Sequence, residues 1–278
     1  MTLRLGNSDR SVGVLQASSL LLNLFPNAAA AYSLRGLRWL GDPVIRVRRS
    51  SDSTEQDFTA AQINDGSLLS FVGSGDGLVT TWYDQSGNGN DATQTTASEQ
   101  PKIVDAGVLV TENGKAALNF DGSDDRLDLG TNFIALQQEP TKWLFATFKD
   151  NRSNPGRVFG ISRGGQSRYT LRARPADGIE FVASDSFNPV GFAYTDNQVL
   201  VTGELSGSTQ AIYKNGVLED TDERGATSTD ANVANIGAFA GGSQLLNGLV
   251  HELIFYPSDQ SANRAAIESN INNYYGIY

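Results

Sequence analysis

GLVTTWYDQSGNGNDATQ, residues 77 to 94, is the stretch of the sequence that decides the fold. Its first half, Leu78 to Tyr83, is apolar and β-branched, which is typical of a half-buried strand. Its second half consists mainly of Ser, Gly, Asn and Asp. Gly and Asn tolerate a positive φ, while Asp and Ser bond their own backbone, so these residues favour tight turns. The stretch therefore predicts a strand that ends at Asp84 in a tight polar loop.

Short apolar runs separated by polar turns continue along most of the chain. Val44, Ile45 and Val47 predict a strand before the organising stretch, and Asn215-Gly216 predicts a hairpin turn. Further strands are expected at 117–120, 126–129, 142–148, 157–161, 169–174, 179–182, 199–205, 210–213, 217–218, 234–236 and 249–256. Turns that recur every roughly 8 to 12 residues are typical of a sandwich or jelly roll. The sequence therefore predicts an all-β sandwich.

Two segments interrupt the strand pattern and predict helices. Thr59 and Gln62 have the spacing of a capping box, so a short helix is expected between residues 59 and 72. The apolar residues of the segment 261–275 fall near one helical face. We expect this short C-terminal helix to cover an edge of the sandwich and shield its open hydrogen bonds.

Composition narrows the class of protein. The 278 residues include 29 glycines and 39% hydrophobic residues, which suits many short strands with one buried face. The net charge of −10 repels phosphate backbones, so nucleic acid is not an expected partner. No run approaches the roughly 20 apolar residues of a membrane span. The absence of cysteine favours folding in a reducing cytoplasm, or a bacterial or viral origin.

Residues 1–28 form an apolar N-terminal arm, and residues 29–278 form one sandwich domain. Arg4 and Arg10 precede a leucine-rich segment, but polar residues interrupt it, so no cleaved signal peptide is expected. Such an arm either docks on a partner surface or packs on its own sandwich. The first alternative predicts a homo-oligomer, or contacts with other proteins of a larger assembly, through residues 1–28.

Several of these segments resemble a known family. Three resemble the N-terminal half of the α-L-arabinofuranosidase B catalytic domain: AAYSLRGL (30–37), DPVIRVRRSSDSTEQDF (42–58) and TTWYDQSGNGNDATQ (80–94). Three others resemble strands of laminin G-like domains: ALNFDGSDDRLDLG (117–130), QAIYKNGVLED (210–220) and LNGLVHELIFYPSDQS (246–261). The resemblance covers about residues 29 to 278. It implies a concanavalin A-like lectin/glucanase sandwich with a C-terminal helix and an N-terminal extension.

The resemblance also implies where catalytic groups would lie. In the family the acid/base aspartate falls in a GGDNSN-like stretch, and the matching residues 236–247, IGAFAGGSQLLN, contain no acid. The adjacent cysteines of the family are absent here. Glu180 is the nearby candidate for the nucleophile, with a plain strand residue as the alternative. Because loss of a catalytic acid costs several powers of ten in rate, a non-catalytic site is expected.

Three functions follow from this comparison. The first is a carbohydrate-binding or adhesion module, since similar segments occur in bacteriophage and marine bacterial proteins. It would be a virion component such as a tail fibre, receptor-binding or capsid-surface protein, or it would lie on a bacterial extracellular surface, with a cell-surface or environmental glycan as partner. The second is a divergent arabinofuranosidase-like glycoside hydrolase. The third is a purely structural cement or spacer of a virion.

Candidate glycan contacts are aromatic residues beside polar ones, because rings stack on sugars and polar groups bind hydroxyls. The candidates are Arg163, Tyr169, Phe187, Asn188, Phe192, Tyr194 and Asp196, each with ordinary packing as the alternative. The three tryptophans, Trp39, Trp82 and Trp143, lie in strand-like surroundings and are expected in the core.

Two acidic groups are candidate calcium sites, which makes calcium the candidate cofactor. Asp84, Asn88, Asn90 and Asp91 alternate oxygen ligands within a glycine-containing loop, with Asx turns as the alternative. Asp121, Asp124 and Asp125 form the second group. His251, the only histidine, alternates with Leu249 and Leu253 and is interpreted as an inner-face or edge residue rather than a base.

Overall fold

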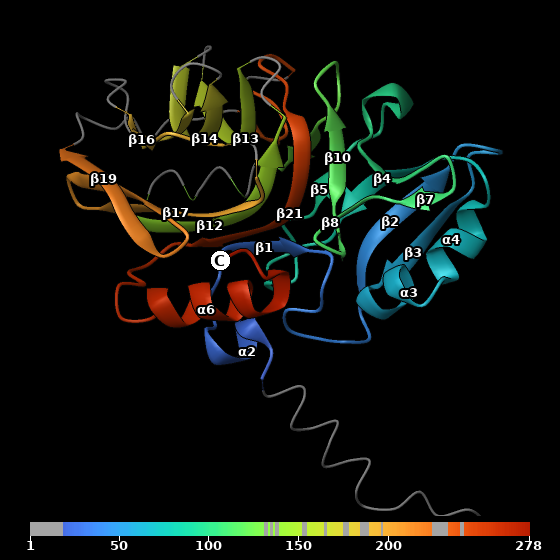
Figure 1. The fold of residues 1–278 in the computed structure, drawn as a ribbon, viewed down its shortest axis with the longest axis horizontal. Helices are drawn as coiled ribbons and strands as arrows, with labels where there is room; N and C mark the ends of the chain where they lie inside the picture. Colours follow the sequence, from blue (N-terminus) through green and yellow to red (C-terminus); the bar gives the residue numbers. More distant parts are fainter. Residues whose placement is uncertain are drawn as a thin grey trace, which may run out of the picture.

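Two antiparallel β-sheets packed face to face form the body of the protein (Figure 1). The computed structural model describes residues 19–130, 133, 136, 139–151, 155–163, 166–174, 178–183, 189–195, 197–223, 233–239 and 242–278, with the backbone alone at 163 and 166–168. The predicted all-β sandwich is confirmed.

Each sheet is built from consecutive antiparallel pairings. The first sheet has the order β19 (Val217–Glu223), β18 (Thr209–Lys214), β17 (Val199–Ser206), β12 (Thr141–Asp150) and β21 (Asn247–Tyr256), with β1 (Ala30–Ser33) and β10 (Leu118–Asp121) along the far side of β21. The second sheet has the order β16 (Val190–Phe192), β15 (Gly178–Val182), β14 (Gln166–Arg174), β13 (Gly156–Arg163), β20 (Val233–Ile236), β11 (Leu127–Leu129), β5 (Ala92–Thr93), β4 (Gly77–Trp82), β2 (Pro43–Arg49) and β3 (Glu55–Thr59).

The strand β6 (Lys102–Asp105) joins the two sheets. It pairs with β4 of the second sheet and with β10 of the first. β7 (Val108–Leu109) extends this corner, while β8 (Thr111–Glu112) and β9 (Lys115–Ala116) pair with each other. The sequence did not predict these strands or β3, because they are short and mix exposed polar residues with few apolar ones.

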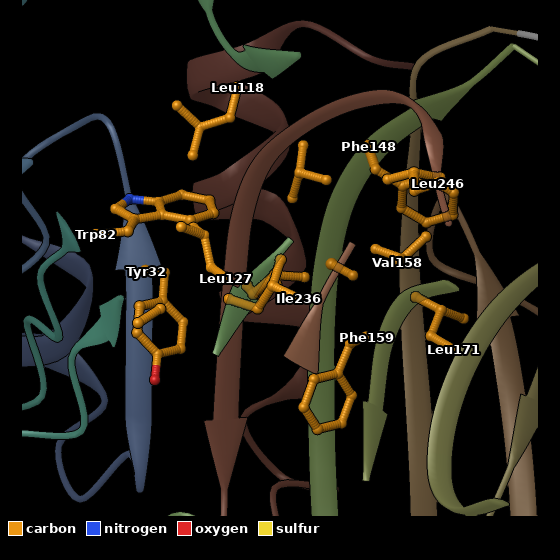
Figure 2. Close-up of a cluster of buried hydrophobic side chains, with 14 of the residues drawn as sticks. Tyr32, Trp82, Leu118, Leu127, Phe148, Val158, Phe159, Leu171, Ile236 and Leu246 are labelled. Carbon is orange, nitrogen blue, oxygen red and sulfur yellow. The ribbon is translucent and has the colours of Figure 1, made fainter. Parts of the chain in front are cut away.

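The main core lies between the two sheets (Figure 2). Phe159 on β13 lies opposite Leu171 on β14 and Ile236 on β20, so the three side chains share the inner face. Phe148 reaches them from the first sheet, and Trp82 and Tyr32 close the same core beside β4 and β1. The periodicity of two along each strand thus places the apolar residues inward and the alternating residues outward.

Helices cover the outer face of the first sheet. α6 (Arg264–Tyr275) and α2 (Leu21–Leu24) lie below β12, β17 and β21 in Figure 1. The C-terminal helix is therefore confirmed, but it covers a sheet face and not an edge. The reason is that this sheet is apolar on both faces: its outward residues Trp143, Phe145 and Tyr256 are buried with the helices in a second apolar cluster.

Part of the N-terminal arm belongs to that second cluster. Leu21, Leu22 and Ala28 are buried there, so residues 19–28 pack on their own sandwich. Residues 1–18 lie outside the described residues. None of the described helices is both long and apolar enough to cross a membrane.

Local turn chemistry places the remaining helices and the hairpin as expected. Thr59 accepts a hydrogen bond from the Gln62 N–H at 3.3 Å and its own N–H donates to the Gln62 side chain at 2.9 Å, which confirms the capping box. Two helices form instead of one, α3 (Ala60–Asn64) and α4 (Ser67–Val72), because Gly66 between them adopts a φ of +92°. Asn215 and Gly216 have positive φ angles of 51° and 82° and join β18 to β19.

The loop after β4 ties the N-terminal strand to the body of the protein. The Asp84 carboxylate accepts hydrogen bonds from the Ala31 N–H at 2.9 Å, the Ser86 N–H at 2.8 Å, the Ser86 hydroxyl at 2.7 Å and the Asn90 N–H at 3.0 Å. The Gln85 N–H donates to the Ala31 carbonyl at 2.8 Å. One carboxylate therefore shapes its own loop and holds β1 in place.

Substitution of this carboxylate should destabilise the whole domain. Asp84→Ala leaves the donors on Ala31, Ser86 and Asn90 without their acceptor, and we expect the free energy of unfolding to fall by about 2–4 kcal/mol. Urea denaturation measures this change. Asp42→Ala is the matched control, because Asp42 is exposed and we expect a change within about 0.5 kcal/mol. Equal effects of the two substitutions would contradict the structural role of Asp84.

Candidate functional site

The outward face of the second sheet carries a row of charged side chains. Arg172 on β14 lies opposite Glu180 on β15 and opposite Arg157 on β13, so the three side chains point to the same side. Their neighbours Tyr169, Leu171 and others of the same strands point into the core instead. This row, Arg157, Arg172 and Glu180, is called the charged row below.

Within the charged row, Glu180 is held by Arg172. Both Nε and Nη2 of Arg172 contact the same carboxylate oxygen of Glu180, and the two side chains are only 5% and 10% exposed. Arg174 Nη1 lies 3.9 Å from that oxygen. A carboxylate that is engaged by arginine in a buried setting is stabilised as a charged partner and is poorly placed to attack a sugar.

Arg157 is the most unusual charge of the row. Burial, followed by the positive charge of Arg172, lowers the pKa of Arg157 to about 9, and the charge of Glu180 opposes this shift. The guanidinium carbon lies 4.6 Å from the ring centre of Phe239, which is itself buried. Phe239 belongs to the stretch 236–247, where the family resemblance places the proton donor. In the described part of this stretch, the Phe239 ring packs on the Arg157 guanidinium at the outward face of the second sheet.

A second row of polar side chains crosses the same face. Register aligns Asp128 on β11 with Asn235 on β20 and with Thr93 on β5. The Asn235 amide donates to the Asp128 carboxylate at 2.6 Å, while half of the Asp128 side chain stays exposed at 50%. Arg126 lies 3.3 Å from Asp128 and 2.7 Å from Glu99. Asp128 and Thr93 are exposed in this row, while Asn235 is buried, and exposed oxygens of this kind bind hydroxyl groups.

The structure places three predicted glycan contacts inside the core. Tyr169 is fully buried, and Phe192 and Tyr194 are 6% and 5% exposed. The Tyr169 ring packs edge-on against Phe159 and Phe181, and burial raises its pKa well above the usual value. For these three residues the structure therefore favours the alternative of ordinary packing over a glycan contact. Tyr169 lies three residues before the outward Arg172 on the same strand, β14, so the pleat turns its ring inward.

The other predicted contacts are not described. Phe187, Asn188 and Asp196 lie outside the described residues, and of Arg163 only the backbone is described. These four stay predictions.

The structure buries two of the three tryptophans that were expected in the core. Trp82 and Trp143 are buried, as expected. Trp39 is 56% exposed, so its assignment to the core was wrong. Its segment, residues 34–42, is an irregular loop and not a strand, and the nearby Arg35, Gly36, Gly41 and Asp42 were the available signal. An exposed tryptophan on a polar loop is a functional signal that sequence reasoning missed.

The two candidate calcium groups have different surroundings. The donors already described surround Asp84, and Asp91 accepts a hydrogen bond from the Asp84 N–H at 2.9 Å. The Asn88 and Asn90 amides donate to the Ala28 and Ala29 carbonyls at 2.9 and 2.8 Å. These contacts favour the alternative of Asx turns, with hydrogen-bond donors in the place of a cation.

The second group is more compact. One carboxylate oxygen from each of Asp121, Asp124 and Asp125 lies within 4.8 Å of the others. Asp125 is 6% exposed and accepts a hydrogen bond from the Asp121 N–H at 3.0 Å. Burial, and then the charge of Asp121, raise the pKa of Asp125 to about 7. Oxygen ligands of this type suit Ca²⁺, and calcium binding here stays a prediction.

The raised pKa predicts an unusual dependence of stability on pH. Between its unfolded pKa near 4 and its folded pKa of about 7, Asp125 holds a proton in the folded protein that the unfolded chain releases. Stability is therefore highest below this range and falls as the pH rises through it. We expect Asp125 to contribute a loss on the order of 2 kcal/mol between about pH 5 and pH 8.

Thermal or urea unfolding at several pH values tests this prediction. Asp125→Asn should remove most of the loss at high pH, while Asp42→Asn should leave it unchanged. If the cluster binds calcium, millimolar CaCl₂ should stabilise the wild type at high pH but not Asp125→Asn. A pH profile that Asp125→Asn does not alter would contradict the assignment.

His251 is an interior residue beneath α6. It is fully buried, and its ring meets the Tyr275 ring edge-on at 5.5 Å. Burial lowers its pKa to about 3, so it is neutral at ordinary pH. The structure buries His251, but beneath α6 on the outer face of the first sheet and not on the inner face or at an edge, as was expected. This position offers no route to act as a base on a ligand.

Comparison with known proteins gives the fold a context. No protein-family model matches the sequence, and no curated protein matches it either. The fold is similar to that of a GH54 α-L-arabinofuranosidase soaked with a cyclic sulfate inhibitor, with a TM-score of 0.66, 18% identity, and coverage of 88% of this chain and 62% of that chain. It is also similar to an arabinofuranosidase complexed with arabinofuranosyl-α-1,2-xylobiose, with a TM-score of 0.64, 17% identity and the same coverages of 88% and 62%.

These comparisons support a β-sandwich of the type found in carbohydrate-active proteins. The chain spans less than two thirds of the length of the two enzymes, at 62%. At this level of identity the likeness establishes the fold alone.

Proposed function

We propose that the protein is a carbohydrate-binding module that does not hydrolyse its ligand. The observation that carries the proposal is the buried contact between Glu180 and Arg172. Glu180 is the carboxylate that the family resemblance brings closest to the role of nucleophile, and here it serves as the partner of an arginine. The outward face of the second sheet has polar groups that suit hydroxyls, while its candidate nucleophile, Glu180, is held by Arg172.

The distance between Glu180 and Asp128 argues against these two carboxylates as a catalytic pair. Glycosidases hold two carboxyl groups roughly 5 to 9.5 Å apart. On the described part of the outward face, Glu180 lies on β15 and Asp128 on β11, with β14, β13 and β20 between them. Strands lie about 4.8 Å apart, so four spacings separate the two residues by roughly 19 Å. That separation is too large for a shared sugar.

Binding and turnover assays test the proposal directly. We expect a glycan array and calorimetry to find a saturable ligand, with no release of aryl product from an aryl arabinofuranoside. Asp128→Ala should weaken binding about tenfold, because it removes an exposed acceptor from this face. Glu219→Ala is the matched control, since Glu219 is exposed on β19, far along the other sheet. Turnover that disappears in Glu180→Gln would instead establish the divergent hydrolase.

Stability separates a structural carboxylate from a catalytic one. If Glu180 is the partner of buried Arg172, Glu180→Gln should lower the free energy of unfolding by about 3 kcal/mol, because a buried arginine loses its counter-charge. Glu219→Gln should have no effect beyond about 0.5 kcal/mol. Unchanged or increased stability of Glu180→Gln would point to a carboxylate kept for function at the expense of stability.

A more specific proposal concerns the assembly in which the binding module acts. We propose an attachment component of a phage particle, such as a tail fibre or receptor-binding protein, supported by the resemblance of the early motifs to phage and marine bacterial surface proteins. A closed homo-oligomer in light scattering, together with binding to host-cell glycan, is the expected result. An assembly without glycan binding would favour the purely structural role.

A further inference from the structure

A hollow lies where α2 and two loops meet, away from the outward face of the second sheet. It has a volume of about 490 Å³ and is lined in part by Asn23, Asn27, Arg38 and Asn88. A smaller hollow of about 140 Å³ adjoins it and is lined by Trp39, Asp42 and Gln85 among others. Gly87 lines both hollows. Together they form the Trp39 groove, whose size is within the range of about 300–1,000 Å³ typical of ligand sites.

Arg38 is a cation with unused hydrogen-bonding capacity in this groove. Its Nη1 donates to the Ser86 carbonyl at 2.6 Å. Among the described residues, no carboxylate forms an ion pair with it, and its Nε and Nη2 have no hydrogen-bond acceptor. A guanidinium offers five donors in a planar fork that fits a carboxylate. The groove therefore presents a cation with donors to spare.

The loop glycine is what allows Arg38 to take this position. Gly87 adopts a φ of +91°, and a Cβ atom on it would collide with Arg38 Nη1. The same loop is held by Asp84, which accepts hydrogen bonds from Ser86 and Asn90. Arg38 thus rests on a loop that is already ordered, so binding need not organise it.

Trp39 supplies an aromatic surface next to this cation. Its side chain is 56% exposed, and the Arg38 guanidinium lies 5.5 Å from its ring centre. A large exposed aromatic ring beside polar groups is the usual means of stacking against the apolar face of a sugar. Leu40 is also exposed nearby, at 47%, but it does not line either hollow.

The rim of the groove contributes further polar groups. The Asn27 amide and the Asp42 carboxylate are exposed and make no hydrogen bond with any described residue. The larger hollow is lined by one cation and several amides, with no carboxylate among its described lining residues. Asp42 lies in the smaller hollow, where a carboxylate can accept hydroxyl protons. The charge distribution favours a ligand with an anionic group at the Arg38 end.

We propose that the Trp39 groove binds an acidic saccharide of the uronic acid type, with its carboxylate on Arg38 and a sugar ring on Trp39. A carboxylate uses the free donors of Arg38, and the hydroxyl groups of the adjoining ring meet Asp42 and Asn27. A neutral sugar can offer hydroxyl oxygens to the guanidinium, but it lacks the negative charge and the paired acceptors that make the contact with a carboxylate stronger. This site is separate from the outward face of the second sheet and does not depend on the function proposed for that face.

Calorimetry with the full chain and two trisaccharides tests the proposal. A galacturonic acid trisaccharide should bind saturably, and a galactose trisaccharide about tenfold more weakly. Arg38→Gln should weaken binding of the acidic trisaccharide about tenfold and abolish the preference over the neutral one, and Trp39→Ala should weaken both. Arg49→Gln and Leu40→Ala are matched controls and should bind like the wild type. Asp128→Ala should also leave this binding unchanged, which separates it from the proposed face.

Fluorescence gives a readout that does not depend on mutation. Trp82 and Trp143 are buried, so iodide should quench mainly Trp39, and the acidic trisaccharide should protect it.

Arg38→Lys keeps the charge without the planar fork and should bind with intermediate affinity. Unfolding midpoints of all variants within about 2 °C of the wild type ensure that a loss of binding is not a loss of fold.

Three results would overturn the proposal. These are no saturable binding at millimolar acidic trisaccharide, equal affinity for the acidic and neutral trisaccharides, or binding that Arg38→Gln and Trp39→Ala both leave unchanged. If Arg38→Gln does not fold, the comparison of Arg38→Lys with the wild type and the protection of Trp39 from iodide decide the question.

Discussion

The carboxylate of Asp84 is the constraint on which the rest of the structure depends. It accepts donors from β1 and from its own loop, so the strand that begins the sandwich is held to the strand that organises it. β1 in turn pairs with the end of β21, the central strand of the first sheet. The same loop forms one wall of the Trp39 groove. One polar interaction therefore supports both the core and a surface with binding capacity.

The two outer faces of the sandwich show how similar sheets take different roles. The first sheet is apolar on its outer face and must be covered, which α6 and α2 do. The second sheet is polar on its outer face, and two of its buried charges, Arg172 and Glu180, form an ion pair. A fold that resembles an arabinofuranosidase thus keeps a polar face while the charges on it hold the sheet together. Function has to be argued from such contacts, because the fold alone accommodates both binding and hydrolysis.

Much of the architecture followed from local patterns. The strand and loop at residues 77–94, the Thr59 capping box, the Asn215-Gly216 turn and the C-terminal helix all rest on interactions within a few residues. The candidate site was less accessible to this reasoning. Trp39 was assigned to the wrong environment, and Tyr169 was left open between a glycan contact and ordinary packing. The reason is that a ring beside polar neighbours looks the same in sequence whether the strand pleat turns it inward or a loop leaves it outside.

The sequence by itself determined the fold class, the turns and the lack of an acid in residues 236–247, since these depend on residue type and short-range periodicity. Only the tertiary structure decided which residues that are distant in sequence come into contact. Arg172 and Glu180 are brought together by strand register, Phe239 and Arg157 by the path of a loop over the sheet, and Arg38 and Gly87 by the contact of two distant loops. Such pairings depend on long-range packing, which no local pattern specifies.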